Sequence, residues 1–161
     1  MTGICFEDVA VGQDIPSIVK GPMSTAHLVR WCAAMENWHL IHFDWRYATQ
    51  VDKLPDVMVN GTWKQNVMIQ LVTDWVGESG WLWKTKFQFR GMNVPGDVLT
   101  AWGRVVSAEP RGAYGVVQLD IGLRNQKGEE GTPGTATVVL PRRGGPPVPY
   151  PFDPACLGAV V

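Results

Sequence analysis

The sequence predicts an α+β domain in which a curved antiparallel sheet wraps around one long central helix. Three observations support this class. An apolar helical pattern runs from Gly61 to Gly77, four strand-like segments follow it, and one short strand precedes it. Strands that succeed one another directly indicate antiparallel pairing, whereas regular alternation of strands and helices would indicate a parallel sheet.

The segment before the long helix is expected to contain one strand and two helices. The strand covers 14–20, the first helix 25–36 and the short second helix 45–50. Ser24 or Thr25 is a suitable N-cap for the first helix and Asp44 for the second, because their side-chain oxygens can accept a hydrogen bond from a free backbone N–H. Asn37 is expected to end the first helix in left-handed geometry.

One stripe of apolar side chains identifies the principal helix. Its members recur at helical spacing and are Trp63, Val67, Met68, Leu71, Val72, Trp75 and Val76. Gly61 opens this helix and Gly77 closes it. Because the stripe is broad, we expect other parts of the chain to surround most of the helix.

Four segments after Gly80 have the period-two pattern of strands. They cover 81–89, 98–108, 114–124 and 134–140, and turns rich in Gly, Pro and Asn separate them. The side chains expected on one face of the first are Trp81, Trp83, Thr85, Phe87 and Phe89. A single sheet of this kind leaves an edge strand free, so we expect it to pair with a second copy or a homologous subunit.

Length and composition fit one globular domain. The chain has 161 residues, of which 45% are hydrophobic and 18% charged, and its formal net charge is −1. The charges are scattered, and no stretch approaches the roughly 20 apolar residues that span a bilayer. The N-terminus lacks the pattern of a signal peptide, and the three cysteines lack metal spacing. We therefore expect a cytoplasmic protein with free thiols and with neither nucleic-acid nor membrane partners.

The C-terminal residues differ in composition from the rest of the chain. Residues 142–154 contain two glycines and five prolines, which exclude a regular helix or a central strand. We therefore divide the chain into a domain over 1–141 and an extended tail over 142–161. The large apolar side chains of Tyr150 and Phe152 leave two possibilities open, a loose tail or a tail that lies across a neighbouring subunit.

The polar residues with chemical potential gather between the first helix and the long helix. His39 and His42 lie three residues apart, and Asn37 and Asp44 flank them. A metal site is one interpretation, but no cysteine or carboxylate cluster completes a ligand set. A structural histidine that bonds to a loop carbonyl is a second. General acid–base chemistry by His42 is the interpretation that we favour.

These residues resemble the hydratase motif of the MaoC-like hydratase/dehydratase family. The matching residues are Asn37, His39, Ile41, His42, Asp44, Tyr47 and Ala48, followed by Val59-Asn60-Gly61 and Val94-Pro95-Gly96-Asp97. The pattern is most similar to a mesaconyl-CoA-hydratase-like branch with the motif Asn-x-His-x-Ile-His-x-Asp. The resemblance covers roughly residues 6–140 and implies a hot-dog fold.

The resemblance implies addition or removal of water at the α,β-double bond of an acyl thioester. In the family a His and an Asp five positions earlier hold the water and move protons. His42 takes the first role, but Asn37 stands in place of the Asp, and an amide can hold water but not accept its proton. His42 is therefore expected to be the main base, and His39 a second proton carrier or an orienter of His42.

A backbone N–H at the start of the long helix is implied to polarise the thioester carbonyl. Gly61 is the candidate donor, because the absence of a Cβ lets a carbonyl approach closely. The alternative is that Gly61 only permits the turn into the helix. Asn60, Asp44 and Trp63 complete the expected site as substrate-binding residues, although Asp44 is first of all a helix cap.

Two classes of function follow. The first is an (R)-type enoyl-thioester hydratase or 3-hydroxyacyl dehydratase that needs no cofactor, with coenzyme A or acyl carrier protein as part of the substrate. The second is a non-catalytic or half-catalytic partner subunit of a heteromeric hydratase. A hot-dog thioesterase is a third option, which we consider weaker because such enzymes usually lack this His motif.

Overall fold

The computed structural model describes residues 4–158 and confirms the predicted fold class, a hot-dog fold. The strands are β1 (Asp14–Lys20), β2 (Trp81–Phe87), β3 (Leu99–Arg111), β4 (Tyr114–Arg124) and β5 (Gly134–Pro141). The helices are α1 (Thr25–Ala34) and the long α2 (Gly61–Val76). Short helical turns are η1 (Phe6–Asp8), η2 (Leu40–His42), η3 (Tyr47–Val51) and η4 (Pro154–Leu157).

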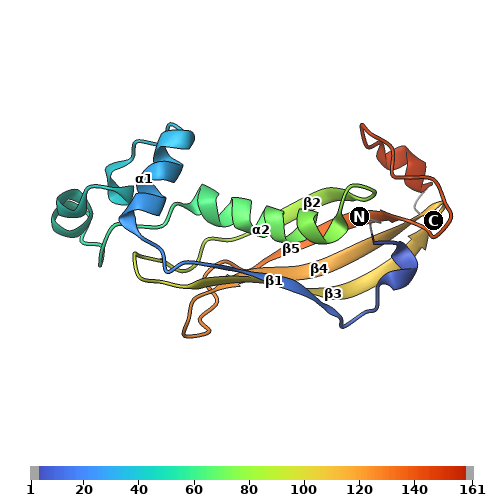
Figure 1. Ribbon diagram of the computed structural model, residues 1–161, viewed down its shortest axis with the longest axis horizontal. Coiled ribbons are helices and arrows are strands. Elements are labelled where there is room, and N and C mark those ends of the chain that lie inside the picture. Colours follow the sequence, from blue (N-terminus) through green and yellow to red (C-terminus); the bar gives the residue numbers. More distant parts are fainter. Residues whose placement is uncertain (1–3, 159–161) are drawn as a thin grey trace.

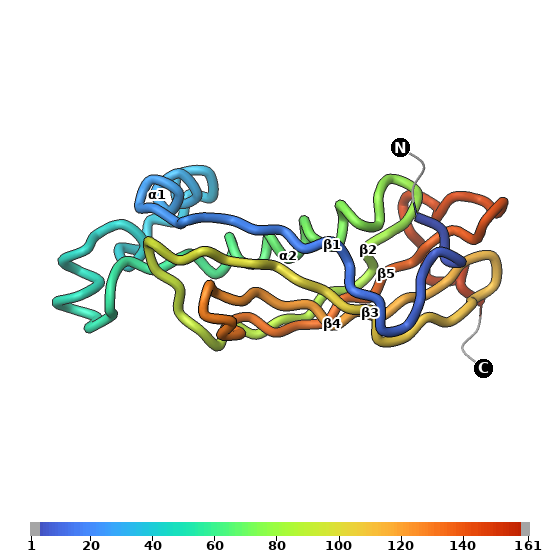
Figure 2. Tube along the Cα trace, turned by 60° about the horizontal axis from the view of Figure 1, so that its bottom comes forward, coloured from blue at the N-terminus to red at the C-terminus, as the bar shows by residue number. Residues whose placement is uncertain are grey.

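The five strands form one antiparallel sheet in the order β1-β3-β4-β5-β2, with β1 and β2 at its edges. Helix α2 runs along one face of this sheet (Figure 1). A lobe that contains α1, η2 and η3 projects beyond one end of the sheet, whereas η1 and η4 lie at the other end (Figures 1 and 2). The segment with the candidate catalytic residues is therefore far from the C-terminal tail.

The core fixes α2 against the sheet. The stripe of α2 is buried at Val67, Met68, Leu71, Val72 and Val76. The inward-facing side chains of the sheet are also buried, among them Leu99, Val105, Leu119, Ile121, Leu123 and Val138. Each such side chain contributes about 1.5–3 kcal/mol on burial. This packing holds the N-terminus of α2 in a defined place at the lobe end of the sheet.

Helix α1 begins as predicted but ends earlier. The Ser24 hydroxyl accepts the His27 backbone N–H at 3.4 Å and so caps the first turn. The helix ends at Ala34, and Glu36 adopts a φ of 51°. The prediction of a helix to residue 36 with left-handed geometry at Asn37 was wrong, because the reversal occurs one residue sooner.

The alternate side chains of strand β2 do not all lie on one face of the sheet, so the predicted alternation was wrong. Its register against β5 shifts between Leu82 and Lys84, the signature of a bulge. Trp81 and Trp83 pack with the C-terminal tail, whereas Phe87 packs against the main core. The bulge adds one residue, so odd-numbered side chains lie on one face of the sheet before it and on the opposite face after it.

Strand β3 is longer than predicted and continues to Arg111. Residues that were expected to form a turn remain paired with β4, including Pro110 opposite Gly115. Strand β1 pairs only with residues up to Arg104, so the far end of β3 has a free side. A proline needs no hydrogen-bonding partner for its nitrogen there.

The tail over 142–158 folds back onto its own chain. The Trp81 ring lies 6.1 Å from the Phe152 ring and 5.7 Å from the Tyr150 ring. The Val148 N–H donates to the Ser79 carbonyl at 3.3 Å, and η4 closes the segment. The aromatic side chains that suggested contact with a neighbour thus find partners on β2, and residues 159–161 lie outside the described part.

Candidate active site

His42 is held in one tautomer by the loop before α2. Its side chain is 8% exposed, and Nδ1 lies 2.8 Å from the Met58 carbonyl oxygen. A carbonyl only accepts hydrogen bonds, so Nδ1 carries a proton, and in the neutral imidazole Nε2 is then the acceptor. This is the tautomer that a general base requires.

The same loop binds the backbone of η2. The Met58 N–H donates to the Ile41 carbonyl at 2.8 Å, and the Val59 N–H donates to the Asn93 carbonyl at 2.8 Å. Met58 is three residues before Gly61, the first residue of α2. His42 is therefore fixed relative to the start of the long helix.

The N-terminal end of α2 has two unused backbone N–H groups within residues 4–158. Asn60 is the N-cap, and its side-chain oxygen accepts the Thr62 N–H at 2.9 Å. Its backbone carbonyl accepts the N–H groups of Trp63 and Lys64 at 3.1 and 3.2 Å. The backbone N–H groups of Asn60 and Gly61 donate to no described residue. The Gly61 N–H is thus a free donor for a ligand at the positive end of the helix dipole.

The Asn60 side chain is buried and forms hydrogen bonds with the first turn of α2. It is 3% exposed, and its Oδ1 also accepts the Thr62 hydroxyl at 2.6 Å. Its Nδ2 has no full hydrogen-bond partner and lies beside the thiol of Cys32, a weak acceptor. Burial raises the pKa of the Cys32 thiol, and the Asn60 contact opposes this. Substrate binding by Asn60 stays a prediction.

Asn37 and His39 lie in the same lobe as His42. The His39 ring is 6.2 Å from the His42 ring and 6.4 Å from the Tyr47 ring, with no direct hydrogen bond to either. Asn37 Oδ1 accepts the His39 N–H at 3.3 Å. The structure therefore places the His39 ring near the His42 ring and the Asn37 side chain on the His39 backbone, and their catalytic roles stay predictions.

Asp44 caps the turn that follows it. Its Oδ1 accepts the Tyr47 N–H at 3.0 Å, which is the capping role expected first for this residue. One carboxylate oxygen is thereby occupied in the backbone of the lobe. A contact between Asp44 and substrate stays a prediction.

Trp63 lines a narrow cleft beside the start of α2. The cleft has about 150 Å³ of empty space, and its walls are Met23, His27, Leu28, Trp31, Val59, Asn60 and Trp63. The Trp31 indole N–H donates to the Thr62 hydroxyl at 2.9 Å and ties α1 to α2 at this point. His42 and Gly61 do not line this cleft. It lies beside the candidate pair and not between its members.

Sequence analysis did not single out Lys64, which is buried in the first turn of α2. Its side chain is 3% exposed, and Nζ donates to the Gly91 carbonyl at 2.8 Å. Burial lowers its pKa from 10.5 to about 8, and the Asp97 carboxylate opposes this shift. A helical projection contains the signal, since Met68 and Leu71 follow Lys64 on the buried face at four and seven residues.

The lowered pKa of Lys64 predicts a rise in stability at alkaline pH. Between about pH 8 and 10.5 the unfolded chain binds more protons at this site than the folded chain, so the free energy of unfolding increases with pH. The increase amounts to as much as about 3 kcal/mol. Urea unfolding at pH 7 to 10.5 measures it, and the Lys64→Met variant is expected to lack it. Equal pH dependence in both proteins would contradict the assignment.

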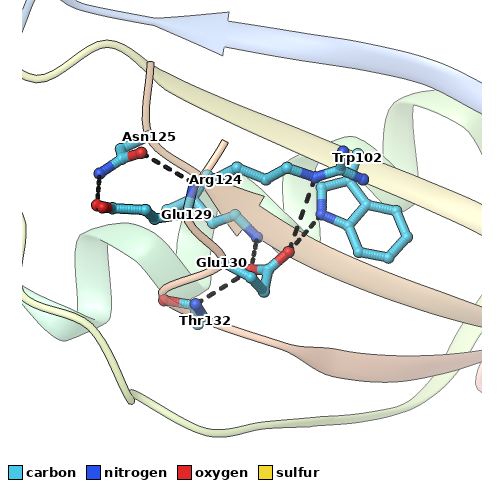
Figure 3. A network of polar contacts seen from close by, with 7 residues as sticks. Trp102, Arg124, Asn125, Glu129, Glu130 and Thr132 are labelled. Atoms are coloured by element: carbon cyan, nitrogen blue, oxygen red, sulfur yellow. Dashed lines mark hydrogen bonds and ion pairs between the residues drawn. The ribbon is translucent and has the colours of Figure 1, made fainter. Parts of the chain in front are cut away.

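The segment that accepts the Lys64 hydrogen bond is anchored by the β4–β5 connection. The N–H groups of Arg90 and Gly91 both donate to the Gly131 carbonyl, at 3.0 and 2.8 Å. Glu130 holds this connection, as its carboxylate accepts from the N–H groups of Leu123, Thr132 and the Trp102 indole. Figure 3 shows Glu130 between Trp102 and Thr132. The Lys64 acceptor is therefore part of a firmly bonded layer.

Metal sites and membrane spans were sought within residues 4–158. No group of three or more His, Cys, Asp or Glu side chains there is placed to hold a metal ion. No helix in that range has the length and apolar character needed to cross a membrane. The metal interpretation of His39 and His42 thus gains no further ligand from this part of the chain.

Several solved structures share this fold at low sequence identity. The R-hydratase PhaJ1 from Pseudomonas aeruginosa superposes with a TM-score of 0.75 and 18% identity, over 88% of each chain. A MaoC-like dehydratase from Rhodospirillum rubrum gives 0.74 and 22%, over 88% of this chain and 99% of the other. The ChsH1-ChsH2 complex from Mycobacterium tuberculosis gives 0.70 and 19%, over 81% and 98%.

Sequence comparison identifies the family directly. No curated protein matches the chain. Residues 12–97, which are just over half of the sequence, match the family described as hydroxyacyl-thioester dehydratase type 2. This range includes the His42 lobe and the start of α2, and the shared fold agrees with it. The chain belongs to the hydroxyacyl-thioester dehydratase type 2 family.

Proposed function

We propose that this chain is an (R)-type hydratase or dehydratase of an α,β-unsaturated acyl thioester, with coenzyme A as the carrier. One observation carries the proposal. The unused N–H of Gly61, in the first turn of α2, lies three residues after the carbonyl that bonds to His42 Nδ1. A base and an oxyanion donor are the two groups that this reaction needs.

In the hydration direction, water attacks the β-carbon while His42 Nε2 accepts one of its protons. The electron pair of the double bond moves toward the carbonyl, which gives an enolate with negative charge on the thioester oxygen. The Gly61 N–H and the N-terminus of α2 stabilise that charge. The proton on His42 then passes to the α-carbon, so the imidazole is restored. Dehydration reverses these steps.

Asn37 is proposed to hold the attacking water. Its Oδ1 accepts the His39 N–H, and its Nδ2 donates to no described residue. The amide can therefore bind a water molecule but cannot take its proton, so His42 remains the only base in this scheme. His39 is proposed to orient the His42 ring or to carry protons, and it lies at the exposed side of the cluster.

An absorbance assay tests the proposed reaction. The purified chain is incubated with crotonyl-CoA, longer and branched enoyl-CoAs and mesaconyl-CoA, and loss of the conjugated enoyl absorbance is followed. We expect enoyl loss without release of free thiol, and preference for mesaconyl-CoA would support the branch suggested by the motif. Thiol release without enoyl loss would instead indicate a thioesterase and would contradict the proposal.

A partner-subunit role is the second candidate, and two observations favour it. Asn37 stands where the wider family has an Asp, and the cleft at α2 does not join His42 to Gly61. The similar ChsH1-ChsH2 structure is a complex of two different chains. Activity that appears only with a co-purifying protein would support this role over that of a self-sufficient enzyme.

We propose that the chain works as a homodimer or as a heteromer with a homologous hot-dog subunit. Strand β2 is a free sheet edge, and the lobe exposes large apolar side chains. Trp38 is 60% exposed and Trp45 57%. A second subunit would cover such surface and enclose a substrate near His42. Light scattering on the purified chain distinguishes these assemblies from a monomer.

A further inference from the structure

The charge of Lys64 is placed where two effects oppose it. Its side chain is 3% exposed, and burial of an ammonium group costs free energy. It is also the fourth residue of α2, where the positive end of the helix dipole disfavours a cation. A lysine at a position with this double cost is expected to have a role other than stabilising the fold.

Lys64 and Gly61 lie on one face of α2, three residues apart. The same extended segment covers both positions. A Cβ on residue 61 would lie 3.4 Å from the ring of Phe89, and the Gly91 carbonyl two residues later accepts the Lys64 ammonium. The free amide of Gly61 therefore lies beside a segment to which the Lys64 ammonium is hydrogen-bonded.

The covering segment is also bonded to the sheet. The Gln88 N–H donates to the Pro133 carbonyl at 3.0 Å, and a Cβ on Gly91 would lie 2.7 Å from the Gly131 Cα. Gly91 must therefore remain a glycine for this close approach. The segment is bonded to the sheet on one side and to Lys64 on the other.

We propose that Lys64 is a positioning residue, whose ammonium clamps the segment 88–91 so that Phe89 shapes the approach of a thioester carbonyl to the Gly61 N–H. The proposal rests on the proposed function for its catalytic consequence, but the clamp itself does not. A charged donor makes a hydrogen bond roughly twice as strong as a neutral one. The clamp is therefore strongest while Lys64 is protonated.

Asp97 is the ionised group that acts on Lys64 among the described residues. Its carboxylate accepts from Val94, Asn93 and Gln126, and the charge of Lys127 lies near it. Burial raises the pKa of Asp97, but these hydrogen bonds and Lys127 outweigh burial and lower it. Asp97 thus stays ionised while Lys64 titrates, and the titration of the clamp belongs to Lys64.

Hydrogen–deuterium exchange tests the clamp without any substrate. In the Lys64→Met variant, the amides of 88–93 are expected to exchange at least about tenfold faster than in the wild type, the change expected on loss of one charge-assisted bond. The matched control is Lys86→Met, which removes an exposed lysine of β2. Rates within about twofold of wild type, or an increase spread over the whole chain, would overturn the proposal.

Kinetics test the positioning role. With an enoyl-CoA substrate, Lys64→Met is expected to lower kcat about tenfold to a hundredfold and to change KM much less, since misplaced groups mainly affect the transition state. The wild-type kcat should also fall as pH rises through about 8. Lys64→Arg, which stays charged, should keep most of kcat and lose that fall. An unchanged kcat in Lys64→Met would overturn the role. So would an equal fall of kcat at alkaline pH in the wild type and in Lys64→Arg.

The proposed function and the Lys64 clamp can be refuted independently of each other. If the wild type acts on no enoyl thioester, the proposed function fails, and exchange at 88–93 still decides the clamp. If the wild type is active and exchange at 88–93 is unaffected by Lys64→Met, the clamp fails and the proposed function stands. Lys64→Met is expected to fold, because it removes a buried charge.

Discussion

Replacing His42 by alanine is expected to lower kcat/KM for enoyl-CoA hydration at least about a thousandfold. The physical reason is that His42 is the only group in the cluster held in the tautomer of a base, through the 2.8 Å bond from Nδ1 to the Met58 carbonyl. Asn37 cannot accept a proton, and one oxygen of Asp44 already caps a turn. Steady-state kinetics with crotonyl-CoA measure the loss.

Two variants separate the loss of the base from damage to the fold. His42→Asn keeps a donor for the Met58 carbonyl but no acceptor nitrogen, so it should fold and remain inactive. His27→Ala removes the third histidine, which lies at the first turn of α1 and bonds with Ser24. Its activity should match that of the wild type. Activity of His42→Ala within tenfold of the wild type would exclude His42 as the base.

The second large effect is expected at Gly61. An added Cβ would lie 3.4 Å from the Phe89 ring, an ordinary contact, so Gly61→Ala should fold with equal or slightly higher stability. The methyl group would narrow the space from which a carbonyl reaches the Gly61 N–H. We expect kcat/KM to fall about a hundredfold, comparable to the loss of one oxyanion donor.

The control for Gly61→Ala is Asn66→Ala, an exposed substitution on the same helix. Both variants are compared by thermal unfolding and by kinetics. A fall in activity at Gly61 with unchanged thermal stability separates the oxyanion role from the alternative that glycine only permits the turn. Full activity in Gly61→Ala would favour the alternative.

The long helix was predictable because local signals mark both its ends. Gly61 and Gly77 bracket an unbroken apolar stripe, and the observed helix runs from Gly61 to Val76. Strand β4 was equally clear, since Val117, Leu119, Ile121 and Leu123 alternate and all are buried. In these elements, local pattern and tertiary burial agree.

The bulge in β2 could not be predicted from periodicity. Alternation of Trp81, Trp83, Thr85 and Phe87 looks regular in sequence, but the strand must serve two surfaces, the tail at one end and the core at the other. The extra residue between Leu82 and Lys84 satisfies both. The contacts of this strand with the C-terminal tail involve residues more than fifty positions away in the sequence, and a local sequence pattern does not contain them.

The candidate site was predictable in its residues but not in its bonds. The motif indicated His42 and Gly61 together, yet the bond from His42 to Met58 and the unused amide of Gly61 depend on how two loops meet. Sequence analysis did not identify Lys64, for a different reason. Hydropathy places a lysine in solvent, although a helical projection places Lys64 on the buried face of α2, and the fold shows that the 88–91 segment covers it.

The most direct test of the central claim is a structure of the His42→Asn variant with crotonyl-CoA bound. We expect the thioester oxygen within hydrogen-bond distance of the Gly61 nitrogen, with the β-carbon facing side chain 42. A crotonyl group bound elsewhere, with the Gly61 amide unoccupied, would contradict the account.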